Sequence, residues 1–186
     1  PNKRVDLLIR AFNRLKLPLI VVGDGVEKQY LNELAGPTVQ ILGFQSKHKI
    51  ESLMSRCRAF VYAGIEDFGI APVEAMACGC VPIGMDIWRV GEILHEMPEE
   101  YRLVVPHTTF IGAAEEEFSV ISIEGLRDVL LNIRERSVKD PVWLQSAQEA
   151  AKEISQKYTE EAFVDRLVGV IEEVKAVGDK IAVESF

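Results

Sequence analysis

Two glutamates on either side of a glycine-containing turn are the residues best suited to chemistry in this sequence. Glu66 and Glu74 are separated by seven residues, within the string E-D-F-G-I-A-P-V-E. The apolar run before Glu66 is short enough for a buried strand. Pro72 suits the first residue of a helix, because its missing N–H costs nothing there. We therefore predict a strand, a loop, a short helix from Pro72 and a further strand at residues 80–83.

This predicted unit favours an anion at the start of its helix. The loop brings the backbone N–H groups of Phe68, Gly69 and Ile70 to that start. Unpaired N–H groups and the positive end of the helix dipole attract phosphate, and a glycine lets a ligand approach the backbone closely. Glu74, expected in the first helical turn beside this position, can accept hydrogen bonds from two hydroxyl groups, such as those of a ribose.

The residues around the two glutamates resemble the retaining glycosyltransferases of the GT-B fold, a family that includes bacterial and archaeal mannosyltransferases. That family carries an E-x7-E motif within E-x-F-G-x-x-x-x-E-A-M-A-x-G, and every one of these letters is present at residues 66–79. Two glutamates at this spacing arise often by chance, whereas the complete string is specific. The resemblance implies an α/β fold: a Rossmann-like, mostly parallel sheet with helices on both faces, as in the C-terminal half of a GT-B enzyme.

Two further segments resemble the same family. Lys3, in K-R-V-D-L-L-I-R-A-F, matches a lysine that contacts the donor diphosphate, and Arg4 stands where glycine is usual. Gly43 and Phe44 match a loop whose backbone lies against the nucleotide base. The G-D-G string at residues 23–25 is interpreted as a turn, because glycines permit positive φ.

The sequence departs from the family pattern after the predicted strand at residues 80–83. The family has a G-G-x-x-E loop whose backbone amides hold the donor sugar and phosphates, but Trp88 and Arg89 occupy the two glycine positions here, and Glu92 keeps the glutamate. Two interpretations stay open. Arg89 could offer its guanidinium to a phosphate and Trp88 a stacking face, or the loop has lost its sugar contacts.

Carried over residue by residue, the resemblance assigns Glu66 to the donor sugar or its reaction centre and Glu74 to the ribose hydroxyls. Lys3 is assigned to the diphosphate. The resemblance implies no metal and no cofactor, because the helix start and basic residues neutralise the leaving diphosphate. The predicted donor-binding residues are Lys3, Phe68, Gly69, Ile70, Glu74 and Arg89, and the predicted base-side loop is Gly43 and Phe44.

The composition fits one globular domain, residues 1–186, in which residues 159–186 form a C-terminal helix and tail. The chain has 186 residues, of which 48% are hydrophobic, and a net charge of −8, which argues against nucleic acid as a partner. No apolar run is long enough to span a membrane. The three cysteines have apolar surroundings, so we expect reduced thiols in a cytoplasmic protein.

The remaining pattern is that of alternating strands and helices. Residues 102–105 are expected to form the last strand, and residues 110–120 a loop or insertion. In the family a strand precedes the helix of residues 1–15. No counterpart is visible, so either the sequence begins after that strand or the sheet lacks it. Helices are also predicted at residues 27–34, 47–56, 122–136, 141–157 and 159–176, and strands at residues 17–22, 39–42 and 59–62.

The function implied by the resemblance is transfer of a hexosyl group from a nucleotide-diphosphate sugar to an acceptor with retention. A mannosyl donor is slightly favoured. This chain would supply the donor-binding half, and a glycan or lipid-linked acceptor would be bound by a separate N-terminal domain. The alternative is a non-catalytic nucleotide-binding or interaction module of GT-B type, which Trp88, Arg89 and the lack of a first strand favour. A GT-B hydrolase or phosphorylase would share this half.

Overall fold

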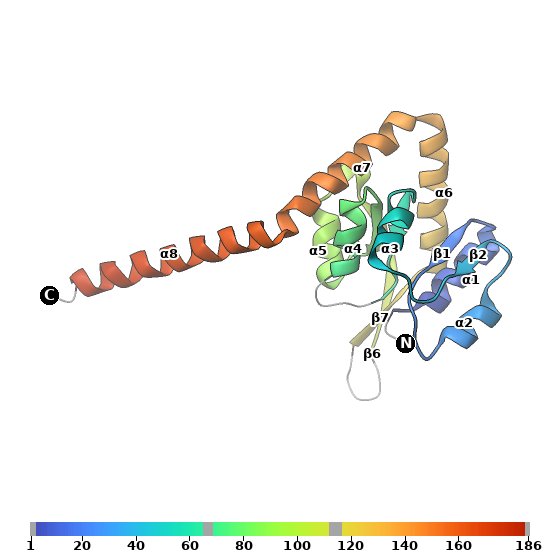
Figure 1. The fold of residues 1–186 in the computed structure, drawn as a ribbon, viewed down its shortest axis with the longest axis horizontal. Coiled ribbons are helices and arrows are strands. Elements are labelled where there is room, and N and C mark those ends of the chain that lie inside the picture. Colours follow the sequence, from blue (N-terminus) through green and yellow to red (C-terminus); the bar gives the residue numbers. More distant parts are fainter. Residues whose placement is uncertain (1–2, 65–68, 112–116, 185–186) are drawn as a thin grey trace.

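The computed structural model describes residues 3–64, 69–111 and 117–184, so Glu66 and Phe68 lie outside the described residues. Its elements alternate between strands and helices along most of the chain (Figure 1). The helices are α1 (Val5–Leu15), α2 (Lys28–Leu34), α3 (Lys47–Met54), α4 (Ile70–Ala77), α5 (Trp88–Glu96), α6 (Ile123–Lys139), α7 (Pro141–Ser155) and α8 (Glu160–Glu184), with short 3-10 turns at Glu99–Tyr101 and Gln156–Tyr158. The strands are β1 (Leu19–Val21), β2 (Val39–Ile41), β3 (Ala59–Val61), β4 (Val81–Met85), β5 (Leu103–Val105), β6 (His107–Ile111) and β7 (Glu117–Ile121).

The parallel strands form two separate sheets. β1 pairs with β2, and β4 lies between β3 and β5, with every pairing parallel. All five residues of β4 are buried, as expected of a strand covered on both faces. Within the described residues no strand joins β1 to β3.

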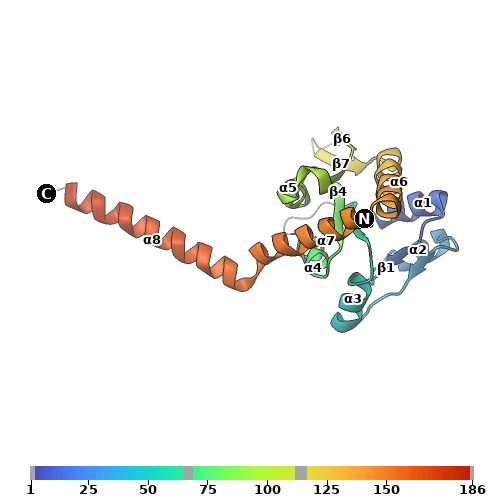
Figure 2. The same ribbon diagram turned by 90° about the horizontal axis from the view of Figure 1, so that it is seen from above.

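Helices cover both faces of the three-stranded sheet, as predicted. In Figures 1 and 2, α4 and α5 lie on one side of β4, and α1 and α6 lie on the other. The apolar positions of α1 fall on one helical face and are buried. The core also contains fully buried side chains from α4, α5 and β4: Met76, Ile93, Leu94, Val81, Ile83 and Met85.

Three predicted helix starts are confirmed, and each has a side-chain capping contact. The Ser46 hydroxyl accepts a hydrogen bond from the Lys49 N–H at 3.3 Å, and the Ser122 hydroxyl accepts one from the Gly125 N–H at 3.0 Å. α7 begins at Pro141, as predicted, after Asp140 as its N-cap. These side chains satisfy amides that a helix leaves without partners at its first turn.

Two expectations about the second half of the chain were wrong. Residues 102–105 do not hold the last strand, because β6 and β7 follow as an antiparallel hairpin. The segment predicted as a loop, residues 110–120, therefore contains paired strand residues at 110–111 and 117–120. The acidic residues in this segment suggested a loop, but threonine, phenylalanine, valine and isoleucine flank them and favour a strand.

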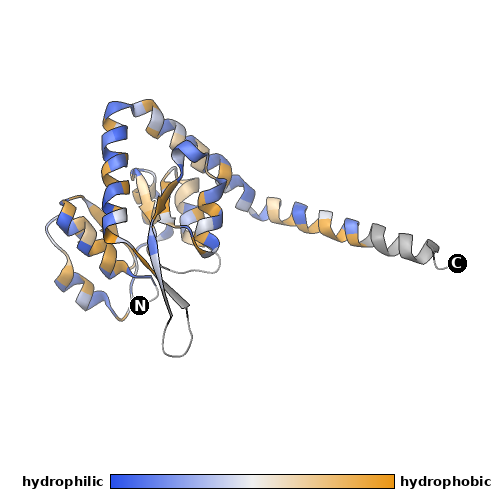
Figure 3. Cartoon of the chain, turned by 180° about the vertical axis from the view of Figure 1, so that it is seen from behind, coloured by the Kyte–Doolittle hydropathy of each residue, from blue (hydrophilic) through white to orange (hydrophobic). Residues whose placement is uncertain are grey.

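The C-terminal helix is longer than predicted and projects away from the body of the molecule (Figure 1). It runs from Glu160 to Glu184 rather than ending near residue 176. Figure 3 shows apolar residues continuing along it. Seven of its apolar side chains are 44–66% exposed: Phe163, Val164, Leu167, Val168, Val170, Ile171 and Val174. Among the helices of the described ranges, none combines the length and hydropathy required to cross a membrane.

Candidate functional site

Of the predicted site residues, Gly69, Ile70 and Arg89 lie at the carboxyl edge of the three-stranded sheet, whereas Gly43 and Phe44 follow β2 in the other sheet. Because β3, β4 and β5 are parallel, their carboxyl ends lie at one edge. The segment that contains Glu66 follows β3, and Trp88 follows β4 by three residues. The β6–β7 hairpin continues from β5 at the same edge (Figure 1). Ligands of open α/β sheets bind outside such an edge.

Gly69 forms the turn into α4. It is buried and has φ 68°, in the left-handed region, and it is the N-cap of the helix. The Val73 N–H donates to the Gly69 carbonyl at 3.2 Å. α4 begins at Ile70, not at Pro72 as predicted, so Pro72 is its third residue. Since a proline has no N–H, the helix start offers the amides of Ile70 and Ala71 to a ligand.

Glu74 is further along α4 than predicted. It is the fifth residue of the helix, in the second turn rather than the first, and it is exposed. Its carboxylate is therefore accessible from the solvent. Glu74 lies in the second turn because the helix starts two residues earlier than predicted, at Ile70 after the N-cap Gly69 instead of at Pro72.

Trp88 begins α5, where the sequence predicted a loop. Its φ is 52°, which is an outlier for a bulky side chain. It is 60% exposed. The structure thus keeps a left-handed backbone at a position where the family pattern has glycine, although the residue is tryptophan.

Arg89, in α5, contacts both the turn at the start of α4 and Tyr158, which lies in the 3-10 turn before α8. A Cβ added to Gly69 would lie 3.3 Å from the Arg89 Cγ, so the arginine stem lies against the turn. The guanidinium contacts the Glu92 carboxylate and lies 5.2 Å from the centroid of the Tyr158 ring. Arg89 therefore has protein partners in the absence of a ligand.

Glu96 anchors the segment that leads into α8. Its carboxylate accepts hydrogen bonds from the Tyr158 hydroxyl and, at 2.9 Å, from the Lys157 Nζ. Burial alone would raise the pKa of Glu96, but these hydrogen bonds outweigh it and lower the pKa. Burial and the bond to Glu96 raise the pKa of Tyr158 to about 12. The sequence did not indicate this cluster, because Glu96 and Tyr158 are far apart along the chain.

Lys3 and Arg4 precede α1. Lys3 is exposed. Arg4 is the N-cap and has φ 44°, so it also keeps a left-handed backbone where the family pattern has glycine. Its side chain is 3.2 Å from the Asp6 carboxylate, and this ion pair holds Arg4 beside its own helix. Of these two cationic residues, Lys3 is the exposed one.

The base-side loop lies beside the G-D-G turn. The Gly23 N–H donates to the Gly43 carbonyl at 2.9 Å, which joins the carboxyl ends of β1 and β2. Gly43 has φ 65°, and Phe44 is 80% exposed. A Cβ added to Gly43 would lie 2.9 Å from the Lys28 Nζ. Lys28 belongs to none of the sequence motifs, but it places a positive charge at this loop and pairs with Asp24.

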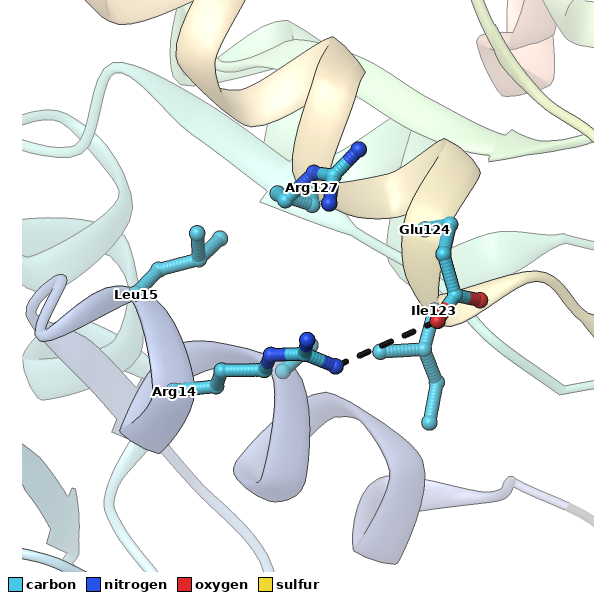
Figure 4. Close-up of a pocket in the computed structure, with 6 residues that line it drawn as sticks. Arg14, Leu15, Ile123, Glu124 and Arg127 are labelled. Atoms are coloured by element: carbon cyan, nitrogen blue, oxygen red, sulfur yellow. Dashed lines mark ion pairs between the residues drawn. The ribbon is translucent and has the colours of Figure 1, made fainter.

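Two hollows on the described surface lie away from the predicted site residues. One is lined by Pro98, Glu99 and Glu100. The other lies between α1 and α6, where Arg14 is 3.9 Å from Glu124 (Figure 4). Neither includes a predicted site residue.

A family model described as "Glycosyl transferases group 1" matches residues 1–106. The chain belongs to the group 1 glycosyltransferases. The match covers the two-part sheet, α4 and α5, and so includes every predicted site residue. The match confirms the predicted glycosyltransferase family, whereas retention of the anomeric configuration stays a prediction.

Among curated proteins, this glycosyltransferase chain is similar to the serotype-specific mannosyltransferase WbdA of Escherichia coli. The two are 27% identical over 109 residues, which cover 50% of this chain and 13% of WbdA. The chain thus spans a small part of the length of that relative.

Solved structures share the fold. Sucrose-phosphate synthase from Thermosynechococcus elongatus has a TM-score of 0.69 and 20% identity, over 95% of this chain and 43% of the synthase. Anabaena HepE, in complex with UDP and glucose, has a TM-score of 0.68 and 19% identity, over 94% of this chain and 46% of HepE. These glycosyltransferases of GT-B type confirm the predicted α/β fold class, and this chain spans less than half of each.

Proposed function

We propose that this chain is the donor-binding half of a glycosyltransferase that moves a hexosyl group from a nucleoside-diphosphate sugar to an acceptor, with retention. The observation that carries the proposal is the turn at Gly69. The complete E-x-F-G-x-x-x-x-E string leads into a helix whose first amides stand at the carboxyl edge of the sheet. A helix start at that edge favours a diphosphate.

In this proposal each residue acts on one part of the donor. The amides at the start of α4 and the Lys3 ammonium balance the charge that develops on the leaving diphosphate. Glu74 accepts hydrogen bonds from the ribose hydroxyls. Glu66, which lies outside the described residues, acts at the donor sugar. Gly43 and Phe44 receive the base, and no metal or cofactor takes part.

The comparisons support a sugar donor and favour a hexose. HepE was solved with UDP and glucose, and WbdA is described as a mannosyltransferase. We retain mannose as the favoured sugar because the E-D-F-G-I-A-P-V-E-A string also resembles mannosyltransferases. The acceptor, a glycan or a lipid-linked glycan, would bind to a separate domain.

A non-catalytic nucleotide-binding module is the second candidate. The observation that favours it is Arg89, which contacts Glu92 and Tyr158 instead of projecting freely. Such a module would bind a nucleoside diphosphate, but its affinity would not depend on the attached sugar, and the chain paired with an acceptor domain would transfer nothing.

Replacing Glu74 by alanine tests the nucleotide site. Calorimetric titration of the chain with GDP, UDP and ADP, and with their hexose conjugates, should show binding of one nucleotide series. We expect Glu74→Ala to weaken that binding by at least about tenfold, since hydrogen bonds to a charged group contribute about 1.5–3 kcal/mol. The thermal unfolding midpoint should stay nearly unchanged, because Glu74 is exposed.

Glu172→Ala is the matched control. Glu172 is also an exposed helical glutamate, but it lies on the projecting helix α8. The Glu172→Ala variant should bind the nucleotide as tightly as the unaltered chain does. If Glu74→Ala also binds normally, the ribose role of Glu74 is wrong. If the folded, unaltered chain binds none of the nucleotides, the donor-half proposal is wrong.

A further inference from the structure

We propose that Arg89 couples diphosphate binding to the segment that leads into α8, because its guanidinium exchanges between the Tyr158 ring and a bound phosphate. This inference rests on the proposed function and concerns the regulation of the same site. The ligand class is a nucleoside diphosphate. The responding element is the hinge segment, residues 156–159, which joins α7 to α8.

Arg89 contacts two parts of the molecule at once. Its inner carbons lie beside the turn into α4, since a Cβ added to Gly69 would be 3.3 Å from the Arg89 Cγ and 3.9 Å from its Cβ. Its guanidinium donates from Nη1 to the Glu92 carboxylate and lies 5.2 Å from the centroid of the Tyr158 ring. Because the Cγ is already beside the turn, rotation about the outer bonds of the side chain carries the guanidinium from Tyr158 to the start of α4.

Tyr158 joins the hinge segment to α5. Its hydroxyl donates to the Glu96 carboxylate, which also accepts a hydrogen bond from the Lys157 Nζ at 2.9 Å. The Arg166 guanidinium, from α8, donates to the Lys157 carbonyl at 2.7 Å. Figure 2 shows α8 leaving the body of the molecule at the end of α7. The contact between Arg89 and Tyr158 is therefore one of the contacts that hold the base of α8.

The contacts of the Arg89 guanidinium are weak enough to be exchanged. The side chains of Arg89 and Glu92 are 33% and 64% exposed, so water screens their ion pair. A cation over an aromatic ring contributes little at a partly exposed site. Bonds from a guanidinium to a phosphate are charge-assisted and can be bidentate, and they are stronger. A diphosphate held by the amides at the start of α4 therefore competes for Arg89.

This exchange unites the two interpretations of Arg89 that the sequence left open. The contacts with Glu92 and Tyr158 belong to the ligand-free state, and the phosphate contact belongs to the bound state. Coupling between two sites is reciprocal. If a diphosphate weakens the contact between Arg89 and Tyr158, loss of that contact strengthens diphosphate binding. Seven apolar side chains of α8 are 44–66% exposed, so little packing holds the helix and a change at its base alters local opening there.

A double-mutant cycle between Arg89 and Tyr158 tests one end of this coupling. Calorimetry would measure the affinities of the unaltered chain, Tyr158→Leu, Arg89→Ala and the double variant for UDP, GDP and ADP. We expect Tyr158→Leu to bind its diphosphate about twofold to fivefold more tightly, because leucine fills the space without offering a ring to the cation. In the Arg89→Ala background the same change should have no effect on affinity. Tyr158→Phe, which keeps the ring, should not bind more tightly.

Hydrogen–deuterium exchange measures the other end. A saturating diphosphate should speed exchange of the amides of residues 156–166 about twofold or more in the unaltered chain and leave it unchanged in Arg89→Ala. This readout needs no substitution at Tyr158. Unchanged exchange on binding, or a Tyr158→Leu variant that binds no more tightly, would overturn the inference. An unaltered, folded chain that binds none of the three diphosphates would overturn the proposed function itself.

Discussion

Replacing Gly69 by alanine is expected to weaken nucleoside-diphosphate binding more than tenfold and to lower the free energy of unfolding by about 1–3 kcal/mol. Gly69 has φ 68°, which disfavours any side chain. An alanine Cβ would also lie 2.9 Å from the Ile93 Cδ1 and 3.3 Å from the Arg89 Cγ. Ile93 is completely buried, so it has little room to move. The start of α4 would shift, and its amides would no longer point together at the phosphates.

The measurement is calorimetric binding together with urea unfolding, and Gly169→Ala is the matched control. A Cβ at Gly169 would meet no atom within 4 Å. Since Gly169 lies within α8, alanine there should raise helix stability slightly and leave binding unchanged. Normal nucleotide affinity in Gly69→Ala would show that the α4 turn does not form the diphosphate site.

Replacing Trp143 by alanine is expected to produce the largest loss of stability, about 3–5 kcal/mol. Trp143 is only 8% exposed, at the start of α7. Its indole N–H donates to the Glu100 carbonyl at 3.2 Å, the Tyr101 ring lies edge-on to it with centroids 6.0 Å apart, and the Arg136 guanidinium lies 4.7 Å from its ring centroid. The substitution would leave a cavity and remove the contact that fixes α7 to the segment before β5.

Urea unfolding monitored by circular dichroism would measure this loss, with Trp143→Phe as the control. Phenylalanine keeps much of the ring but cannot donate to Glu100, so a smaller loss is expected, about 1–2 kcal/mol. A loss of less than about 1 kcal/mol in Trp143→Ala would contradict the packing described for this residue, given the range for buried aromatic residues.

The elements with local signals were predicted well. The short apolar run before Glu66, the capping residues Ser46 and Ser122, and the helix start at Pro141 all lie where the sequence placed them. Each depends on a few neighbouring residues. The start of α4 was misplaced by two residues, because Pro72 is tolerated at any position of a first turn and Gly69 supplied an unpredicted left-handed cap.

The missed features depend on contacts between residues distant in the sequence or on backbone conformation. Arg89 and Tyr158 meet only because α7 returns the chain to α5. The left-handed φ of Trp88 and Arg4 cannot be inferred from residue type, since both types avoid that region. In each case the tertiary structure overrides the local preference. At position 88, tryptophan stands where the family pattern has glycine, but the backbone has the left-handed φ that a glycine adopts easily.

The projecting helix α8 divides the molecule into parts that unfold separately. Its described apolar side chains from Phe163 to Val174 are at least 44% exposed, so few tertiary contacts support it. Such a helix depends mainly on its own hydrogen bonds, and it can fray without disturbing the core. Part of the helical signal at 222 nm therefore follows a helix–coil equilibrium of α8. The amides of β4, by contrast, exchange with solvent only when the sheet itself opens.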